Sequence, residues 1–309
     1  MELKKALEGL IISRSAEGVS PYTIQVYRYG IKKLNDYLNN PEIESIKKED
    51  IQKFIVHLRE ETNLSESSLV NVRRGISVLF NWAEKELNIK RPDDGISYPK
   101  APITNVEPFS SDEIRRLLSA CNYSKTSKTK ERNSFRMKRP TANRDKTIIL
   151  VLLDTGLRVS ELSRLQLKDL DLETGEIRVR PYDSGLKSKS RSVFIGKLSK
   201  STLWRFLSVK YFQPEDYIFT TLQGFSMNRT SIRQLLERIG NRAEVLNVYP
   251  HRFRHTFAIQ YLRNGGDVFT LQRLLGHSSL EIVRRYLAIA KSDCETAHRK
   301  ASPVDNWRL

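Results

Sequence analysis

Four prolines interrupt the helical pattern of this chain between residues 91 and 108. Proline lacks a backbone N–H and its ring clashes with the preceding turn, so none of them can lie inside a helix. The four are Pro92, Pro99, Pro102 and Pro108. The chain of 309 residues is also long for a single domain. The sequence therefore predicts two domains, residues 1–98 and 109–309, joined by a linker at 99–108.

The segment before the linker has the periodicity of a small helical bundle. One stripe of apolar residues recurs at spacings of three and four, which places its members on one helix face. Its members are Ile24, Tyr27, Ile31, Leu34 and Leu38. Ser20-Pro21 predicts the start of that helix and Asn39-Asn40-Pro41 its end. Similar stripes predict three more helices, near residues 3–11, 51–58 and 69–83.

The segment after the linker combines helices with one hairpin. Ser110 and Glu113 have the spacing of a capping box, so a helix is expected to begin there. Alternation of apolar and polar residues at 176–180 and 190–195 predicts two antiparallel strands. Helices are also expected in three further places: from about Gly156 to Arg164, at about 231–242 and within 249–286. The predicted fold class is mainly α with a small antiparallel β-sheet in the second domain.

Positive charge is concentrated after the linker. The chain holds 53 Lys and Arg against 36 Asp and Glu, a formal net charge of +17. Residues 1–100 contain 16 basic and 15 acidic residues, which leaves 37 basic and 21 acidic residues for 101–309. This imbalance predicts a polyanionic partner that binds chiefly to the second domain.

The sequence gives no sign of a membrane segment. No stretch approaches the run of about 20 apolar residues that a spanning helix needs. The amino terminus lacks the apolar core of a signal peptide. Cys121 and Cys294 are expected to be inert thiols, which fits a reducing cytoplasm.

A basic stretch at 122–146 fits neither domain pattern. Nine Lys and Arg lie between residues 125 and 146 against two acidic residues, and apolar residues are few. Such a composition disfavours a packed element. We expect a disordered loop or one that DNA orders; a solvated insertion without a role is the alternative.

The stretch 249–286 holds the densest set of chemically active side chains. His251 and Arg254 are three apart, so they share one helix face. His277 falls in a tight turn after a glycine, and Tyr286 follows nine residues later within a helical pattern.

These residue types match the requirements of phosphodiester transfer without a metal. The transition state gathers negative charge on the non-bridging oxygens, and forked guanidinium groups bind such oxygens in pairs. A tyrosine can attack phosphorus and a lysine can protonate the leaving alkoxide. A histidine can accept the phenolic proton or donate a hydrogen bond to the phosphate.

The order of these motifs resembles that of the tyrosine recombinase, or phage integrase, family. TGLRVSEL resembles the first family motif, with Arg158 as its arginine and Glu161 as its supporting acidic neighbour. HRFRH resembles the His-x-x-Arg motif, LLGHSS the Leu-Gly-His motif, and RRYLAI the tyrosine motif. The resemblance implies these catalytic residues: Arg158, Lys187, His251, Arg254, His277 and Tyr286.

The lysine motif departs from the family pattern. Family members carry Lys-Gly-x-Lys-x-Arg at the hairpin tip, whereas this chain has GLKSKSRSVFI, with no glycine after Lys187 and a spacing one residue short. Anchoring on Lys189-x-Arg191 selects Lys187, and Lys189 remains the alternative. Four residues are predicted to contact DNA: Arg191, Arg252, Lys128 and Lys130.

The resemblance implies a site-specific DNA recombinase that works through a 3′-phosphotyrosine intermediate, without metal, ATP or other cofactor. Residues 1–98 would be the SAM-like core-binding domain and 109–309 the α+β catalytic domain, with a tail at 291–309. Strand exchange implies a homotetramer on two double-stranded DNA sites, formed from a monomer or weak dimer. The implied location is cytoplasmic and nucleoid-associated, and an accessory directionality factor is a further partner that the resemblance allows.

Two other functions stay open at this point. A type IB topoisomerase shares the tyrosine chemistry but works alone. A non-catalytic DNA-binding regulator would account for the charge but not for the ordered motifs. A zinc site at His251 and His255 is disfavoured, because HRFRH lacks the Glu of H-E-x-x-H and its two arginines would repel a cation.

Overall fold

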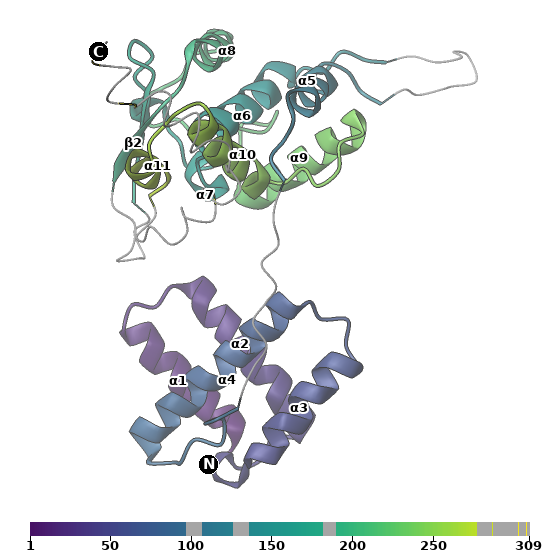
Figure 1. The fold of residues 1–309 in the computed structure, drawn as a ribbon, viewed down its shortest axis with the longest axis vertical. Coiled ribbons are helices and arrows are strands. Elements are labelled where there is room, and N and C mark those ends of the chain that lie inside the picture. Colours follow the sequence, from purple (N-terminus) through teal and green to yellow (C-terminus); the bar gives the residue numbers. More distant parts are fainter. Residues whose placement is uncertain are drawn as a thin grey trace, which may run out of the picture. The chain divides into compact units, whose positions relative to one another are not determined.

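The computed structural model describes residues 1–96, 107–125, 136–181 and 190–276, together with Tyr286, Ser302 and Trp307. These residues fall into two compact units, one before residue 97 and one from residue 107 onward (Figure 1). Most of the predicted linker at 99–108 and of the tail at 291–309 lies outside the described residues, so the exact domain boundaries stay predictions.

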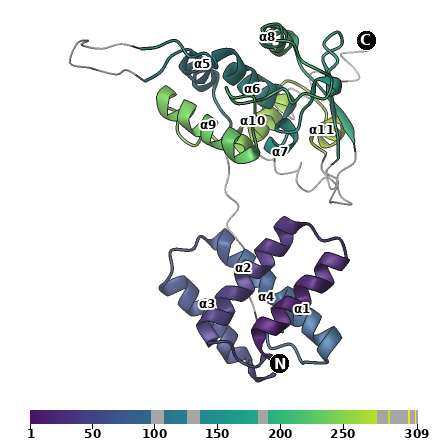
Figure 2. The ribbon, with the colours of Figure 1, turned by 180° about the vertical axis from the view of Figure 1, so that it is seen from behind.

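The first unit is a bundle of four α-helices. They are α1 (Leu3–Ala16), α2 (Pro21–Leu38), α3 (Lys48–Glu60) and α4 (Glu66–Leu87), with a short 3₁₀ turn at Ile43–Ser45. The sequence predicted the ends of α2 from local chemistry. Ser20 Oγ accepts a hydrogen bond from the Thr23 backbone N–H at 3.3 Å, and Asn39 ends the helix at a φ of 60°. Figures 1 and 2 show α1 and α3 on opposite sides of the α2–α4 pair.

Two glycines let α2 and α4 pack closely. A Cβ atom added to Gly30 would lie 2.7 Å from the Val72 carbonyl oxygen, and one added to Gly75 would lie 2.9 Å from the Tyr27 carbonyl oxygen. Both neighbours are backbone atoms, which cannot move aside without moving a helix. The crossing of these two helices therefore requires glycine at both positions.

The second unit surrounds a buried helix with shorter helices and a hairpin. Its helices are α5 (Ser111–Ala120), α6 (Ala142–Thr155), α7 (Val159–Leu162), α8 (Lys197–Leu207), α9 (Arg229–Ala243), α10 (Pro250–Arg263) and α11 (Val268–Leu275), with a 3₁₀ turn at Leu167–Asp169. The strands β1 (Glu176–Val179) and β2 (Arg191–Phe194) pair antiparallel, with Ile177 opposite Val193. The described residues are therefore mainly helical with one small antiparallel sheet, which confirms the predicted fold class.

Helix α6 forms the centre of this unit. Ile148, Ile149, Val151 and Leu152 are fully buried, although they do not share one face. A helix that is apolar all round is covered on all sides. Here α8, α10 and strand β2 contact it. Gly156 ends it at a φ of 62°, and the chain then turns into α7.

The structure corrects two expectations about this unit and adds two helices. The helix predicted from about Gly156 to Arg164 is the single turn α7, which begins after Arg158 and leaves Leu157 outside it. Helices α6 and α8 were not predicted. The basic stretch 122–146 is not entirely a loop, because α6 begins at Ala142.

The described ends of the basic stretch are anchored to the domain. Tyr123 and Lys138 form a β-bridge. The Asp145 side chain is fully buried and binds Arg139 at 2.8 Å and Arg144 at 2.7 Å. Hence Arg139 and Arg144 are held by the protein itself. Lys128 and Lys130 lie outside the described residues.

The described helices contain no membrane-spanning candidate, since none is both long and apolar enough to cross a bilayer.

The close crossing of α2 and α4 can be tested with Gly30→Ala. The added methyl should lower the free energy of unfolding by about 1–3 kcal/mol through overpacking, despite a gain of about 1 kcal/mol in helix propensity. Gln25→Ala, on the exposed face of α2, is the matched control and should not destabilise the protein. Urea unfolding of the full-length variants measures both. A Gly30→Ala protein as stable as the control would contradict the crossing.

Candidate active site

Three arginines converge on the carboxyl end of α11. Arg191 Nε donates a hydrogen bond to the Leu274 carbonyl at 2.7 Å, and Arg254 Nη2 donates to the Leu275 carbonyl at 2.7 Å. Arg158 Nη2 donates a longer bond of 3.4 Å to the Gly276 carbonyl. The last carbonyls of a helix lack intrahelical partners and carry partial negative charge, so they stabilise nearby cations.

Arg158 sits at the start of α7, where its side chain stays accessible. Its backbone N–H donates to Glu161 Oε2 at 2.8 Å and its Nη1 donates to Oε1 at 3.0 Å. The side chain is 37% exposed, so the guanidinium can still meet a ligand from solvent.

Glu161 neutralises two of these arginines. Its side chain is 8% exposed and receives both terminal nitrogens of Arg191, at 2.9 and 2.8 Å. Burial opposes ionisation of the carboxyl, but the hydrogen bonds and charges of Arg191 and Arg158 outweigh it and lower the pKa of Glu161 to about 2. Glu161 is therefore a permanent anion at neutral pH.

Arg254 is held deep in the unit by α10. It is 4% exposed, and its Nη1 donates to the Gly156 carbonyl at 2.7 Å. Burial first, and then repulsion by Arg158, lower its pKa to about 10, which still leaves it charged at neutral pH. Glycine at position 156 allows the end of α6 to lie this close to α10, because a Cβ atom there would lie 2.4 Å from Phe257 Cδ1.

His251 lies one turn before Arg254 on α10 and remains accessible to solvent. Partial burial, followed by the positive charges of Arg254 and Arg158, lowers the pKa of His251 below its ordinary value of 6.5. At neutral pH the imidazole is therefore mostly uncharged, and one of its nitrogens can accept a proton.

Tyr286 packs against α10 and α11. It is 5% exposed and belongs to an apolar cluster with Ala258, Ile259, Leu271 and Leu275. Its ring centroid lies 5.3 Å from that of His255, which directly follows Arg254 on α10. The structure thus brings Arg158, Glu161, Arg254 and Tyr286 to one region beside α11.

His255 is a contact that the sequence did not assign to the site. Its position one turn after His251 was the available signal. The structure adds that it lies against Tyr286. Burial, His251 and Arg254 all lower the pKa of His255, so it too is mostly uncharged at neutral pH.

Two predicted catalytic residues, Lys187 and His277, and the alternative lysine, Lys189, lie outside the described residues, and their roles stay predictions.

Two predicted DNA contacts instead bind within the protein. Arg252 is 8% exposed, and its nitrogens donate to the carbonyls of Glu107 and Leu246 and to the carboxylate of Glu113. It also stacks 3.9 Å over the Phe109 ring. Arg191 is held by Glu161 and α11. These placements argue against both predicted contacts, because buried guanidiniums with protein partners are not available to a phosphate.

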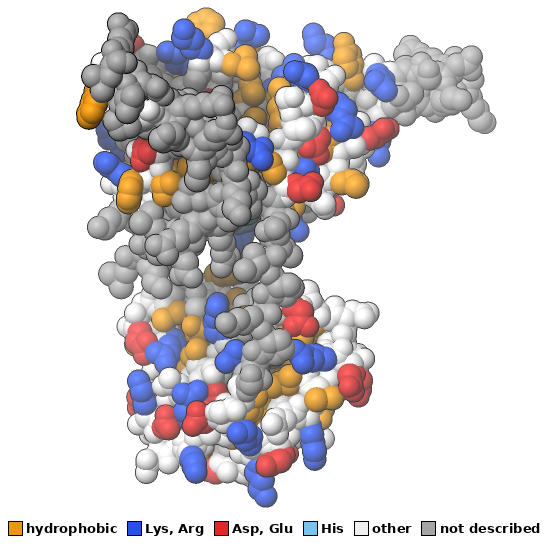
Figure 3. Space-filling model, in the orientation of Figure 1, with side chains coloured by type: hydrophobic (Ala, Val, Ile, Leu, Met, Phe, Trp, Pro, Cys, Tyr) orange, Lys and Arg blue, Asp and Glu red, His pale blue; other side chains and the backbone are white. Residues whose placement is uncertain are grey.

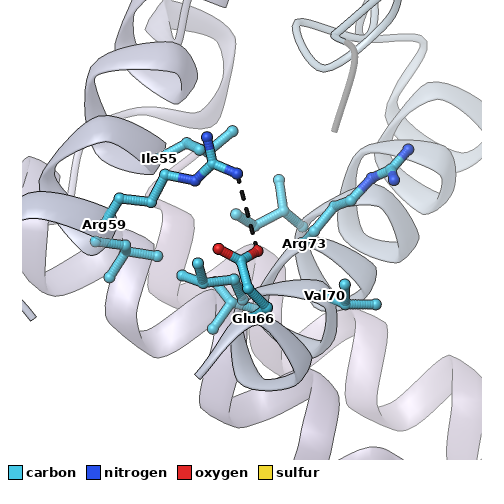
Figure 4. Close-up of a pocket in the computed structure, with 9 residues that line it drawn as sticks. Ile55, Arg59, Glu66, Val70 and Arg73 are labelled. Atoms are coloured by element: carbon cyan, nitrogen blue, oxygen red, sulfur yellow. Dashed lines mark ion pairs between the residues drawn. The ribbon is translucent and has the colours of Figure 1, made fainter. Parts of the chain in front are cut away.

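Among the described residues, no group of three or more His, Cys, Asp or Glu could hold a metal ion. A separate shallow pocket lies between α3 and α4 (Figure 4). Ile55 and Val70 give it an apolar lining, and Arg59 faces Glu66 at 3.9 Å across it. It contains none of the predicted catalytic residues.

The Glu161 network can be tested with Glu161→Gln. Losing the carboxylate leaves Arg191 buried beside Arg158 without a counter-ion, so the free energy of unfolding should fall by about 3–5 kcal/mol. The pKa of Glu161 is lowered in the folded state, so its stabilisation is complete above about pH 4.5 and is lost as the pH falls toward 2. The stability difference between wild type and variant, measured by denaturation across this range, should shrink accordingly. A difference that does not vary with pH would contradict the network.

Comparisons with known proteins identify the family of this chain. The sequence model of the phage integrase family matches residues 108–293, and that of the phage integrase N-terminal SAM-like domain matches residues 7–89. The tyrosine recombinase XerA of Thermococcus kodakarensis is 30% identical over 292 residues, covering 94% of this chain and 92% of that protein. The tyrosine recombinase XerC of Oceanobacillus iheyensis is 29% identical, covering 97% and 95%.

A solved structure shares the fold. The Tn1549 transposon integrase in complex with a circular intermediate DNA superposes with a TM-score of 0.76 at 21% identity, covering 98% of this chain and 99% of that one. The family models together span both units of the chain. The chain therefore belongs to the phage integrase family and is a tyrosine-type site-specific recombinase.

Proposed function

We propose that this chain cuts and rejoins double-stranded DNA through a covalent link between Tyr286 and a 3′-phosphate, with no metal or nucleotide cofactor. The observation that carries the proposal is the convergence of Arg158, Arg254 and Tyr286 beside the carboxyl end of α11. Two guanidiniums from separate elements can bind both non-bridging oxygens of one phosphate, and a tyrosine beside them can attack it.

In the first step the Tyr286 oxygen attacks phosphorus and the bond from phosphorus to the 5′-oxygen breaks. His251, uncharged at neutral pH, accepts the phenolic proton or donates a hydrogen bond to the phosphate. Lys187 gives a proton to the leaving 5′-oxygen, and His277 donates a hydrogen bond to a non-bridging oxygen. Arg158 and Arg254 neutralise the charge that gathers on those oxygens.

The return step reverses this chemistry. A 5′-hydroxyl from a partner strand attacks the phosphotyrosine, a new phosphodiester forms, and the tyrosine oxygen regains its proton. Because the ester of a phenol stays activated, the energy of the broken bond is retained and ATP is not needed. Family membership favours this recombination over the relaxation of a type IB topoisomerase.

The charge distribution supports DNA as the partner, with the second unit as its chief contact. Basic and acidic side chains are interspersed over the visible face of the first unit (Figure 3). The excess of 37 basic over 21 acidic residues after residue 100 supplies the attraction to phosphate. Two structurally similar proteins, the recombinase XerH and the lambda integrase, are bound in their structures to a difH substrate and a core site respectively.

Recombination of two sites would assemble a homotetramer from a protein that is monomeric or weakly dimeric in solution. The first unit would hold DNA as the core-binding domain, and an accessory protein could set direction. A cytoplasmic, nucleoid-associated location would follow from that substrate.

The nucleophile can be tested with Tyr286→Phe. Removing the phenolic oxygen should abolish the covalent adduct with a nicked duplex that carries the recombination site, in the presence of a chelator, while DNA binding persists. Tyr261→Phe is the matched control, because Tyr261 packs in the same cluster and should keep the adduct. Denaturing gels report the adduct. An adduct in Tyr286→Phe, or strict dependence on a metal, would refute the proposal.

The general acid can be tested with Lys187→Ala and Lys189→Ala. Lys187→Ala should slow cleavage far more, because one lysine meets the leaving oxygen. A 5′-phosphorothiolate substrate has a sulfur leaving group that needs no proton, so it should restore cleavage in the variant that lacks the true acid. Restoration in Lys189→Ala alone would transfer the role to Lys189.

A further inference from the structure

Arg191, one of the three arginines beside α11, is held by protein groups on every side of its guanidinium. It begins strand β2, and its side chain is 10% exposed. Its Nη1 and Nη2 donate to the two oxygens of Glu161 at 2.9 and 2.8 Å, and its Nε donates to the Leu274 carbonyl at 2.7 Å. All three nitrogens of its guanidinium therefore have protein acceptors.

One of these acceptors, Glu161, also binds Arg158, and the other, the Leu274 carbonyl, adjoins the two carbonyls that bind Arg254 and Arg158. Glu161 binds the side chain and the backbone of Arg158. Leu274 directly precedes Leu275 and Gly276, whose carbonyls accept from Arg254 and Arg158. Arg191 and Arg158 thus share the carboxylate of Glu161. The carbonyl that Arg191 binds is also one peptide unit before the carbonyl that Arg254 binds.

The packing at Gly276 shows how tightly Arg191 fits against the end of α11. Gly276 has a φ of 63°, which a residue with a side chain rarely adopts. A Cβ atom there would lie 3.2 Å from Arg191 Nη1 and 3.3 Å from its Cδ and Cζ. The arginine therefore fills the space beside the last turn of the helix.

We infer that Arg191 is a positioning residue, which fixes Glu161 and the carboxyl end of α11 and through them aligns Arg158 and Arg254 on the scissile phosphate. It does not bind DNA itself. The inference rests on the proposed function. A lysine could supply the same charge but not the fork that binds both oxygens of a carboxylate.

We expect the loss of Arg191 to slow cleavage only when the scissile phosphate carries a charge that the arginines must neutralise. A methylphosphonate at the scissile position has a methyl in place of one charged oxygen, so it needs much less help from the aligned arginines. The experiment measures single-turnover cleavage of a phosphodiester and of a methylphosphonate duplex at saturating protein. The variants are Arg191→Met, Arg191→Lys and, as control, Arg178→Met, which removes an exposed cation from the neighbouring strand β1.

Arg191→Met should cleave the phosphodiester roughly 100-fold more slowly, as expected for misplaced catalytic groups. The loss should shrink to a few-fold on the methylphosphonate. Affinity for DNA and its salt dependence should not change, and Arg178→Met should cleave both substrates like wild type. Arg191→Lys should behave like Arg191→Met. If thermal melting shows that Arg191→Met does not fold, the two substrates are compared with Arg191→Lys instead.

Two results would overturn the inference. A salt slope reduced by about 0.9, with normal cleavage of bound DNA, would make Arg191 a phosphate contact. Equal losses on both substrates would mean general damage to the domain. Failure of the proposed function can be distinguished from failure of this inference, because the wild-type protein itself would then form no covalent adduct with DNA.

Discussion

The carboxyl end of α11 determines where the cations of the second unit lie. The three final carbonyls of this short helix, at Leu274, Leu275 and Gly276, all accept from arginine side chains. An unpaired buried carbonyl is costly, and arginine can satisfy it while carrying charge toward the negative end of the helix. The contacts that satisfy this helix end are therefore the same contacts that bring together the three arginines of the proposed site.

Two glycines make that assembly sterically possible. Gly156 ends α6 and offers its carbonyl to Arg254, and a Cβ atom at this position would clash with Phe257 and Leu275. Gly276 ends α11 and leaves room for Arg191. The chain can thus bring α6, α10 and α11 close enough for guanidiniums to reach backbone carbonyls. Each glycine has a positive φ, so a larger residue would be strained as well as crowded.

Local chemistry made much of the fold predictable from the sequence. Ser20, Ser110 and Asp267 each accept a hydrogen bond from a backbone N–H three residues later, as the capping patterns indicate. The hairpin strands were visible as alternation of residue types. The helix predicted at the position of α7 was too long. The apolar pattern does not show that α6 ends at Gly156 and that α7 has only one turn. The exposed face of α8 carries too many large apolar residues to give a clear stripe, and the helix was missed.

The roles of individual arginines depend on partners far along the chain. Arg252 is held by Glu113, which lies 139 residues earlier, and Arg191 by Glu161, which lies 30 residues earlier. Nothing in the residues adjacent to either arginine reveals that partner, so the predicted DNA contacts could not take it into account. Arg158, Glu161 and Arg254 were assigned to the site because their motifs resemble those of the family. Their contacts with α11 became visible only in three dimensions.

Without a bound phosphate, the proposed site contains more positive than negative charges. Three guanidiniums surround one carboxylate and one helix end, and burial together with Arg158 lowers the pKa of Arg254 to about 10. Protein groups hold the buried Arg191 and Arg254, whereas Arg158 remains accessible from solvent. A phosphodiester between Arg158 and Arg254 would supply the missing negative charge, and the transition state would supply more of it. The network around Glu161 therefore does not need to move during the reaction. It holds in place, before DNA binds, the positive field that the chemistry requires.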